Sequence, residues 1–244
     1  IERFVEIDEI LKTGGRGRGA GIGGRGTVKS EIQNPKSEII RIAVARDNAF
    51  CFYYQENLDI LKQLGAKLVS FSPLKDKRLP GNINGIYLGG GYPELYAKRL
   101  ETNKPMRKAI KDFAERGMPV YAECGGLMYL GKGLKNFKGK KYEMVGVFPW
   151  VSRMLEKRRS LGYREVRIID GCPFLNKGQK IRGHEYHYSE IDEPSNRIKR
   201  VYQFTGKEGY LYKNTLASYV HLHFASNPKF AEGFVRSCSL CPPH

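Results

Sequence analysis

One cysteine, Cys124, ends an apolar segment and is followed at once by Gly125 and Gly126. The segment MPVYAEC (118–124) has the composition of a buried strand, and GGLMYLGKGL (125–134) is typical of a helix. A sharp strand-to-helix turn directs a side chain out of the sheet edge, where small neighbours relieve crowding. The unpaired N–H groups at a helix start stabilise a thiolate, which is the nucleophilic form of cysteine. The pattern therefore predicts a nucleophile at Cys124; a small buried residue at a strand end is the alternative.

A thiolate that attacks a carbonyl places negative charge on the carbonyl oxygen, and backbone N–H groups must receive that charge. The N–H of Gly125 directly follows the predicted nucleophile and is expected to be one donor. A second glycine-rich turn, Gly89-Gly90-Gly91, follows the apolar segment IYL. We expect Gly90 and Gly91 to supply the second donor.

A thiol nucleophile also needs a base, and His221 and His223 lie together in SYVHLHF. Positions two apart in a strand share one face, so both rings could face the same cleft; ordinary core histidines are the alternative. Another pair, His184 and His187 in GHEYHYS, would face opposite sides of a strand and could not share one metal ion. We expect that segment to form a polar wall of the cleft rather than a metal site.

The segments between 39 and 236 predict an α/β fold with a doubly wound, mostly parallel sheet. Apolar strand segments alternate with helical segments in the first half, and short strands and turns dominate the second half. The expected strands of the first half are 39–45, 67–72, 85–90 and 118–124, and the expected helices are 53–64, 94–100, 105–116 and 125–134. The expected strands of the second half are 142–148, 164–169, 181–191, 200–204 and 216–224, followed by a helix over 227–236.

The segments outside 39–236 differ from this α/β region in composition. Residues 1–12 mix apolar and acidic positions at helical spacing and are interpreted as the end of a preceding domain, so that the chain is expected to be part of a longer protein. Residues 13–38 are interpreted as a linker, because glycine and arginine dominate 13–30 and there is little to bury. An RNA contact is one alternative, and a nucleotide-binding loop at Gly19-x-Gly21-x-x-Gly24 is another. Residues 237–244 are interpreted as a C-terminal tail.

The overall composition restricts the function classes. The chain has 244 residues, with 42 Lys and Arg against 25 Asp and Glu, giving a formal net charge of +17. Such an excess attracts polyanions, so a basic RNA-binding protein is a second hypothesis, although the basic residues are spread rather than gathered into one module. The five cysteines show no repeated spacing, so no disulfide framework is expected, and the Cys238-x-x-Cys241 pair is a weak metal motif. No apolar run is long enough to cross a membrane and no secretory leader is visible, which favours a cytoplasmic protein.

Several segments together resemble one family. They are, in chain order, ARDNAFCFYYQENLDILKQLGAKLVSFSPLKD, LPGNINGIYLGGGYPELYA, MPVYAECGGLMYLGKGL, GHEYHYS and ASYVHLHFASNP. They resemble the C-terminal domain of cobyrinic acid a,c-diamide synthase and of its relative, nickel-sirohydrochlorin a,c-diamide synthase. The likeness covers about 39–236, and 1–12 resembles the end of the family's ATP-binding domain.

The resemblance implies a triad-type, class I-like glutamine amidotransferase fold with Cys124 as nucleophile and His221 as base, because Tyr219 and His221 match the family's Tyr-x-His order. Ammonia cut from glutamine would serve an N-terminal P-loop synthetase domain, which would use ATP and magnesium to activate a- and c-acetate carboxylates of a tetrapyrrole. No P-loop sequence occurs in this chain, so no cofactor is expected to bind here. Cobyrinate is the first choice of tetrapyrrole, and nickel-sirohydrochlorin of coenzyme F430 biosynthesis is the alternative.

Three positions depart from the wider amidotransferase pattern. Ala122 stands where many relatives have glycine, and Met128 stands where many have a glutamine that holds the substrate. His223 stands where many have the glutamate that completes the triad. The carboxylate is therefore expected to be missing or to come from elsewhere, with Glu185 as the suggested donor and His223 as a supporting group.

Overall fold

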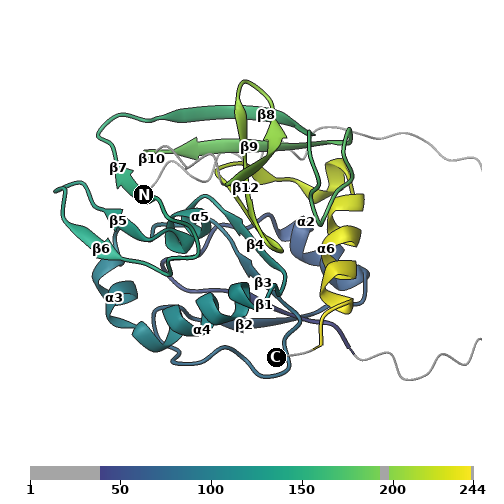
Figure 1. The fold of residues 1–244 in the computed structure, drawn as a ribbon, viewed down its shortest axis with the longest axis horizontal. Helices are drawn as coiled ribbons and strands as arrows, with labels where there is room; N and C mark the ends of the chain where they lie inside the picture. Colours follow the sequence, from purple (N-terminus) through teal and green to yellow (C-terminus); the bar gives the residue numbers. More distant parts are fainter. Residues whose placement is uncertain (1–38, 193–197, 243–244) are drawn as a thin grey trace, which may run out of the picture. The chain divides into compact units, whose positions relative to one another are not determined.

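The computed structural model describes residues 39–192 and 198–242. The interpretations of 1–12 and 13–38 fall outside the described residues. Within the described part, strands and helices alternate through the first half, as expected, and strands dominate the second half (Figure 1).

The first half contains four strands and four helices that lie within or close to the predicted segments, but the helix expected over 125–134 ends at Leu130, and the chain from Gly133 enters a strand. The strands are β1 (Arg41–Ala45), β2 (Lys67–Phe71), β3 (Gly85–Leu88) and β4 (Val120–Glu123). The helices are α2 (Gln55–Gln63), α3 (Ala97–Thr102), α4 (Lys104–Glu115) and α5 (Gly125–Leu130).

The second half adds ten short strands, a 3₁₀ turn and one helix. These elements are β5 (Gly133–Lys135), β6 (Lys141–Glu143), β7 (Val151–Met154), β8 (Ser160–Ile168), β9 (Lys180–His187), β10 (Ser189–Ile191), β11 (Lys199–Gln203), β12 (Lys207–Tyr212), β13 (Thr215–Ser218), β14 (His221–Leu222), η1 (Phe224–Ser226) and α6 (Lys229–Ser239). The strand expected over 142–148 is wrong beyond Glu143, because the backbone of Val145 and Gly146 bonds to the end of α5 instead of to a strand.

The main sheet has ten strands in the order β14-β9-β8-β11-β12-β13-β4-β3-β1-β2. The five strands from β13 to β2 pair in parallel, and the pairs from β12 to β14 are antiparallel. The predicted α/β class is confirmed, and the parallel pairing is confined to the half that carries β4. A second sheet has the order β10-β7-β5-β6.

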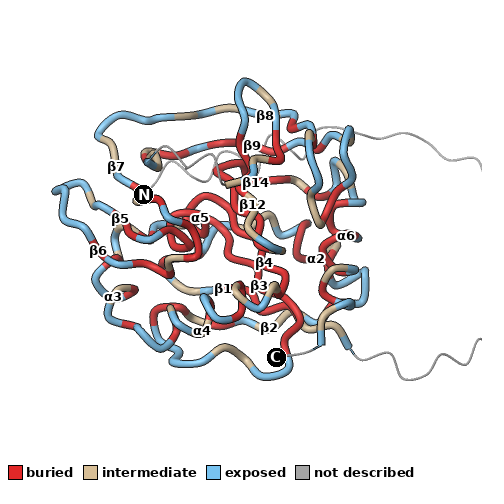
Figure 2. The backbone as a smooth tube through the Cα atoms, viewed as in Figure 1, coloured by how far each residue is buried: buried red, intermediate tan, exposed pale blue. Residues whose placement is uncertain are grey.

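Two apolar clusters lie on opposite faces of the parallel strands, because side chains alternate along each strand. One cluster includes Ile86, Val120 and residues of α4 and α5, and the other includes Ile42, Tyr87 and residues of α2 and α6. Figure 2 shows the continuous buried path through β4 and α5. The sheet is therefore covered by helices on both faces, as a doubly wound fold requires.

The C-terminal segment is ordered further than predicted. Helix α6 continues to Ser239, and the side chain of Cys238 is fully buried, so the tail expected over 237–244 is wrong for its first residues. The missing side chain of Gly85 makes the necessary room, since a Cβ there would lie 2.4 Å from the Cys238 sulfur. No helix in the described ranges is long and apolar enough to cross a membrane.

Candidate active site

Cys124 lies between β4 and α5 in a backbone conformation that side chains rarely adopt. Its φ is 47° and its ψ is −97°, and it is the N-terminal cap of α5. The backbone is held from both sides, because the Cys124 N–H donates to Ser218 and the Cys124 carbonyl accepts from Met128. A conformation of this kind costs on the order of 1–3 kcal/mol and persists only where the surroundings enforce it. The predicted strand-to-helix turn is present at this cysteine.

Two glycines make the turn sterically possible. A Cβ on Gly126 would lie 2.4 Å from the carbonyl oxygen of Leu88, so only glycine allows α5 to approach β3 this closely. A Cβ on Gly90 would lie 2.4 Å from Cε1 of His221, so the absence of a side chain there leaves room for the imidazole.

Of the three glycine N–H groups predicted to receive the oxyanion, one already has a backbone acceptor and two do not. The Gly90 N–H donates to the Phe52 carbonyl, so it does not serve as an oxyanion donor in this arrangement. The N–H groups of Gly91 and Gly125 have no acceptor among the described residues. They are neighbours, because a Cβ on Gly125 would lie 3.1 Å from the Gly91 nitrogen. Two free donors beside the thiol form a site that could receive an oxyanion.

His221 reaches this junction although five strands separate β14 from β4 in the sheet order. The sheet curls until its edge strand returns to β4, and the Leu222 N–H donates to Oε1 of Glu123 over 3.0 Å. The His221 side chain is buried, with 4% of its surface exposed. Nδ1 of His221 lies 3.7 Å from Oε2 of Glu123, within ion-pair range, and Cys124 is close enough to raise the pKa of the ring.

Glu123 is the site residue that the sequence analysis missed. Its carboxylate accepts from the Tyr87 hydroxyl (2.9 Å) and the Tyr121 hydroxyl (2.6 Å) and faces His221. The signal was present, because a glutamate at the end of an otherwise apolar, fully buried strand is costly without partners. The sequence analysis assigns that strand only the role of supporting Cys124.

The electrostatics of the site favour a charged imidazole. Burial lowers the pKa of His221, but the hydrogen bonds and charges of Cys124 and Glu123 outweigh it and raise that pKa to about 10. His221 therefore carries two protons at neutral pH, with Nδ1 facing Glu123 and Nε2 left for the sulfur of Cys124. Such a pair suits a thiolate nucleophile beside a proton donor.

The two supporting residues suggested by the sequence, His223 and Glu185, do not contact His221. Nε2 of His223 lies 2.8 Å from Glu56 at the surface, because β14 ends at Leu222 and the chain turns into η1. Glu185 accepts from Arg164 over 2.7 Å and from a serine hydroxyl, away from the thiol. The carboxylate that faces His221 in the structure is that of Glu123, and the Glu185 carboxylate faces Arg164 instead.

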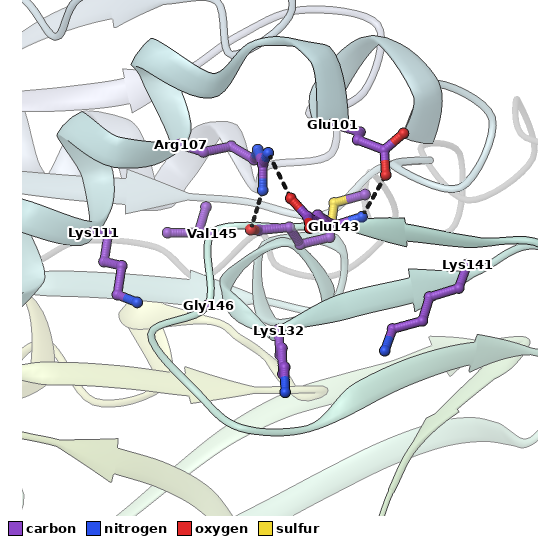
Figure 3. Close-up of a pocket in the computed structure, with 9 residues that line it drawn as sticks. Glu101, Arg107, Lys111, Lys132, Lys141, Glu143, Val145 and Gly146 are labelled. Carbon is purple, nitrogen blue, oxygen red and sulfur yellow. Dashed lines mark hydrogen bonds and ion pairs between the residues drawn. The ribbon is translucent and has the colours of Figure 1, made fainter.

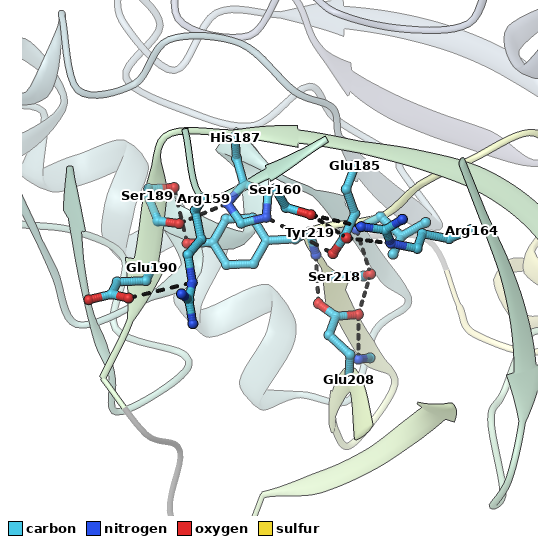
Figure 4. A network of polar contacts seen from close by, with 12 residues as sticks. Arg159, Ser160, Arg164, Glu185, His187, Ser189, Glu190, Glu208, Ser218 and Tyr219 are labelled. Atoms are coloured by element: carbon cyan, nitrogen blue, oxygen red, sulfur yellow. Dashed lines mark hydrogen bonds and ion pairs between the residues drawn. The ribbon is translucent and has the colours of Figure 1, made fainter. Parts of the chain in front are cut away.

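A buried polar network fixes the turn that precedes His221 (Figure 4). The Glu208 carboxylate accepts from the Ser218 hydroxyl (2.5 Å) and the Tyr219 N–H (2.7 Å). The Tyr219 ring stacks on His187 with centroids 3.9 Å apart, and the Ser189 hydroxyl donates to the Tyr219 hydroxyl. Burial raises the pKa of Glu208 to about 7.

Met128 is buried with its sulfur 3.4 Å from the Ser189 hydroxyl oxygen, so its side chain is committed to packing. No group of three or more His, Cys, Asp or Glu side chains in the described part could hold a metal ion.

A cavity of about 480 Å³ lies elsewhere, between α4 and β6 (Figure 3). The charged side chains that line it are Glu101, Arg107, Lys111, Lys132, Lys141 and Glu143.

Comparison with known proteins agrees with this geometry. The CobB/CobQ-like glutamine amidotransferase domain family matches residues 41–229. This chain belongs to that family. Cobyrinate a,c-diamide synthase of Syntrophotalea carbinolica is 48% identical over 220 residues, covering 86% of this chain and 48% of the relative. The same enzyme of Picrophilus torridus is 42% identical over 239 residues, covering 98% of this chain and 51% of the relative.

The chain spans about half the length of these relatives. Solved structures agree on its fold. A glutamine amidotransferase gives a TM-score of 0.59 at 15% identity, covering 81% of this chain and 98% of that one. A glutamine amidotransferase from Thermotoga maritima gives 0.55 at 14% identity, covering 81% of each chain. The predicted class I-like fold is confirmed.

Proposed function

We propose that this amidotransferase domain hydrolyses glutamine to glutamate and ammonia, with Cys124 as nucleophile, His221 as acid and base, and Glu123 as the carboxylate that orients His221. The observation that carries the proposal is the meeting of these three side chains at the β4–α5 turn. Gly91 and Gly125 would receive the oxyanion, and Gly90 would leave space for the imidazole.

The first half of the reaction uses His221 as the proton donor. The Cys124 thiolate attacks the side-chain carbonyl carbon of glutamine, and the oxyanion accepts hydrogen bonds from Gly91 and Gly125. The His221 imidazolium then gives its proton to the amide nitrogen, the C–N bond breaks and ammonia leaves. A glutamyl thioester remains on Cys124.

The second half reverses the role of the imidazole. Neutral His221 takes a proton from water, and the resulting hydroxide attacks the thioester carbonyl. The C–S bond breaks, glutamate leaves, and the thiolate is restored beside a protonated His221. Glu123 stabilises the imidazolium at the start and end of each cycle.

We infer that the ammonia is used in the ATP-dependent amidation of the a- and c-acetate carboxylates of cobyrinate. The support is the activity for which the relatives are named and their length, about twice that of this chain, which leaves room for a partner synthetase domain that would hold ATP and magnesium. Nickel-sirohydrochlorin is the less favoured substrate, since the relatives from Syntrophotalea carbinolica and Picrophilus torridus are named cobyrinate a,c-diamide synthases. The RNA-binding hypothesis has only the +17 charge and residues 13–30 in its favour. The cytoplasmic location stays a prediction.

The test uses Cys124→Ser in the complete enzyme that contains this chain. We expect glutamine-dependent amidation to fall at least about 10³-fold while amidation with ammonium chloride is retained. Cys51→Ser, at an exposed thiol, is the matched control and should keep both activities. Loss of both activities in Cys124→Ser, or retention of the glutamine-dependent one, would contradict the proposal.

A further inference from the structure

A second imidazole lies face to face with His221. His184 is directly opposite His221 in the β9–β14 pair, and the two rings are stacked with centroids 4.8 Å apart and planes within 11°. Phe52 meets both rings edge-on, at 4.8 Å from His221 and 5.5 Å from His184. The imidazole of His221 is therefore held between aromatic groups from two distant parts of the chain.

His184 is itself fixed by Tyr54. The Tyr54 hydroxyl lies 2.5 Å from Nδ1 of His184, and a neutral imidazole that accepts at Nδ1 carries its proton on Nε2. Burial, and then the charge of His221, lower the pKa of His184 to about 4. The two stacked rings thus differ in charge at neutral pH, because His221 is cationic and His184 is neutral.

We propose that His184 is a positioning residue for His221: its neutral ring, held by Tyr54, is a flat surface that stabilises the imidazolium and fixes the plane of the base. A cation over an aromatic face is attracted to it, most strongly where water is excluded. A fixed ring plane keeps Nδ1 on Glu123 and Nε2 on Cys124 in both halves of the reaction. The inference rests on the proposed function, because it takes His221 as the base.

The groups that set the charge of His221 come from several elements. Glu123 and Cys124 raise its pKa from the β4–α5 turn, and His184 faces it from β9. His187, also on β9, is close enough for the His221 charge to lower its own pKa. Among these groups, His184 is the one stacked on the ring of the base, so its removal tests the stack without removing a charge.

The test is made in the complete enzyme that contains this chain, and it compares His184→Ala, which removes the ring, with His184→Phe, which keeps a flat aromatic face. For His184→Ala we expect kcat for glutamine hydrolysis to fall about 10- to 30-fold with little change in KM, and the His221 titration, followed by ¹⁵N NMR of labelled histidines, to move down by about one pH unit. His184→Phe should recover most of both losses. Tyr54→Phe should leave the stack in place but allow both tautomers of His184 to appear in the spectra.

Two outcomes would overturn the inference. An unchanged His221 titration in His184→Ala would show that the stack does not stabilise the imidazolium. A His184→Phe variant as defective as His184→Ala would show that the ring nitrogen matters and the aromatic face does not. The His221 titration needs no glutamine. It therefore tests whether the His184 ring stabilises the imidazolium even if the Cys124→Ser variant contradicts glutamine hydrolysis.

Discussion

Substitution of Glu123 by glutamine removes one charge from the buried site and changes few contacts. Glutamine has nearly the same shape, and its carbonyl oxygen can still accept from the Leu222 N–H or from a tyrosine hydroxyl. The charge that faces Nδ1 of His221 is lost. The variant therefore tests whether Glu123 is electrostatically coupled to the base.

The expected size of the effect follows from the distance. Two unit charges 3.7 Å apart interact by about 4.5 kcal/mol at an effective dielectric constant of about 20. That energy corresponds to about 3 pH units, so the pKa of His221 should fall from about 10 to about 7. Loss of the orienting carboxylate should also lower kcat by about 10³- to 10⁴-fold, as in hydrolases whose triad aspartate is replaced by its amide.

Two measurements follow these quantities separately. NMR titration of ¹⁵N-labelled histidine reports the protonation of His221, and glutaminase assays report kcat. Stability gives a third signal: because the folded pKa of His221 lies above its ordinary value of 6.5, its contribution is complete below pH 6.5 and is lost as pH rises through about 10. In Glu123→Gln that loss should be nearly absent.

Glu185→Gln is the matched control, because Glu185 is another carboxylate near the histidines that bonds to Arg164 and not to His221. It should leave the His221 titration within a few tenths of a unit. The reasoning is refuted if Glu123→Gln titrates like the wild type, or if Glu185→Gln shifts His221 as strongly.

Two further variants test other parts of the site. In Gly90→Ala the new Cβ would lie 2.4 Å from His221, and a displacement of the imidazole by about 1 Å should lower glutaminase kcat by about 10²-fold. Gly81→Ala is the control, because its Cβ meets nothing within 4 Å, and it should be active. Equal activity of the two variants would contradict this account. Glu208→Gln should change the pH dependence of folding, because the folded pKa of Glu208, about 7, lies above its ordinary 4.5. The wild type should lose about 3 kcal/mol relative to the variant between pH 4.5 and pH 7, measured by urea unfolding, and parallel curves would show that Glu208 does not titrate there.

The sequence predicted the parts of the site that local chemistry defines. The apolar run before Cys124 and the two glycines after it are consecutive residues, and together they predict the strand-to-helix turn. The Cys124–His221 pair came from the family resemblance, and the structure brings the two together. The roles of Gly90 and Glu185 could not be read in the same way, because a free N–H or an ion pair depends on which distant residue lies opposite.

The tertiary structure alone decided how His221 is charged and held. Alternation along one strand predicts His223 on the same face as His221, and Glu185 is the carboxylate that the sequence suggests. The sheet instead curls and brings β14 back to β4, where Glu123 lies beside the nucleophile. The hydrophobic pattern and the turn residues that determine a strand or a helix lie within a few consecutive residues, so the sequence alone reveals them. The pKa of a buried imidazole depends on charges and rings within a few ångströms in space, and those were contributed by segments about 40 to 170 residues away in sequence.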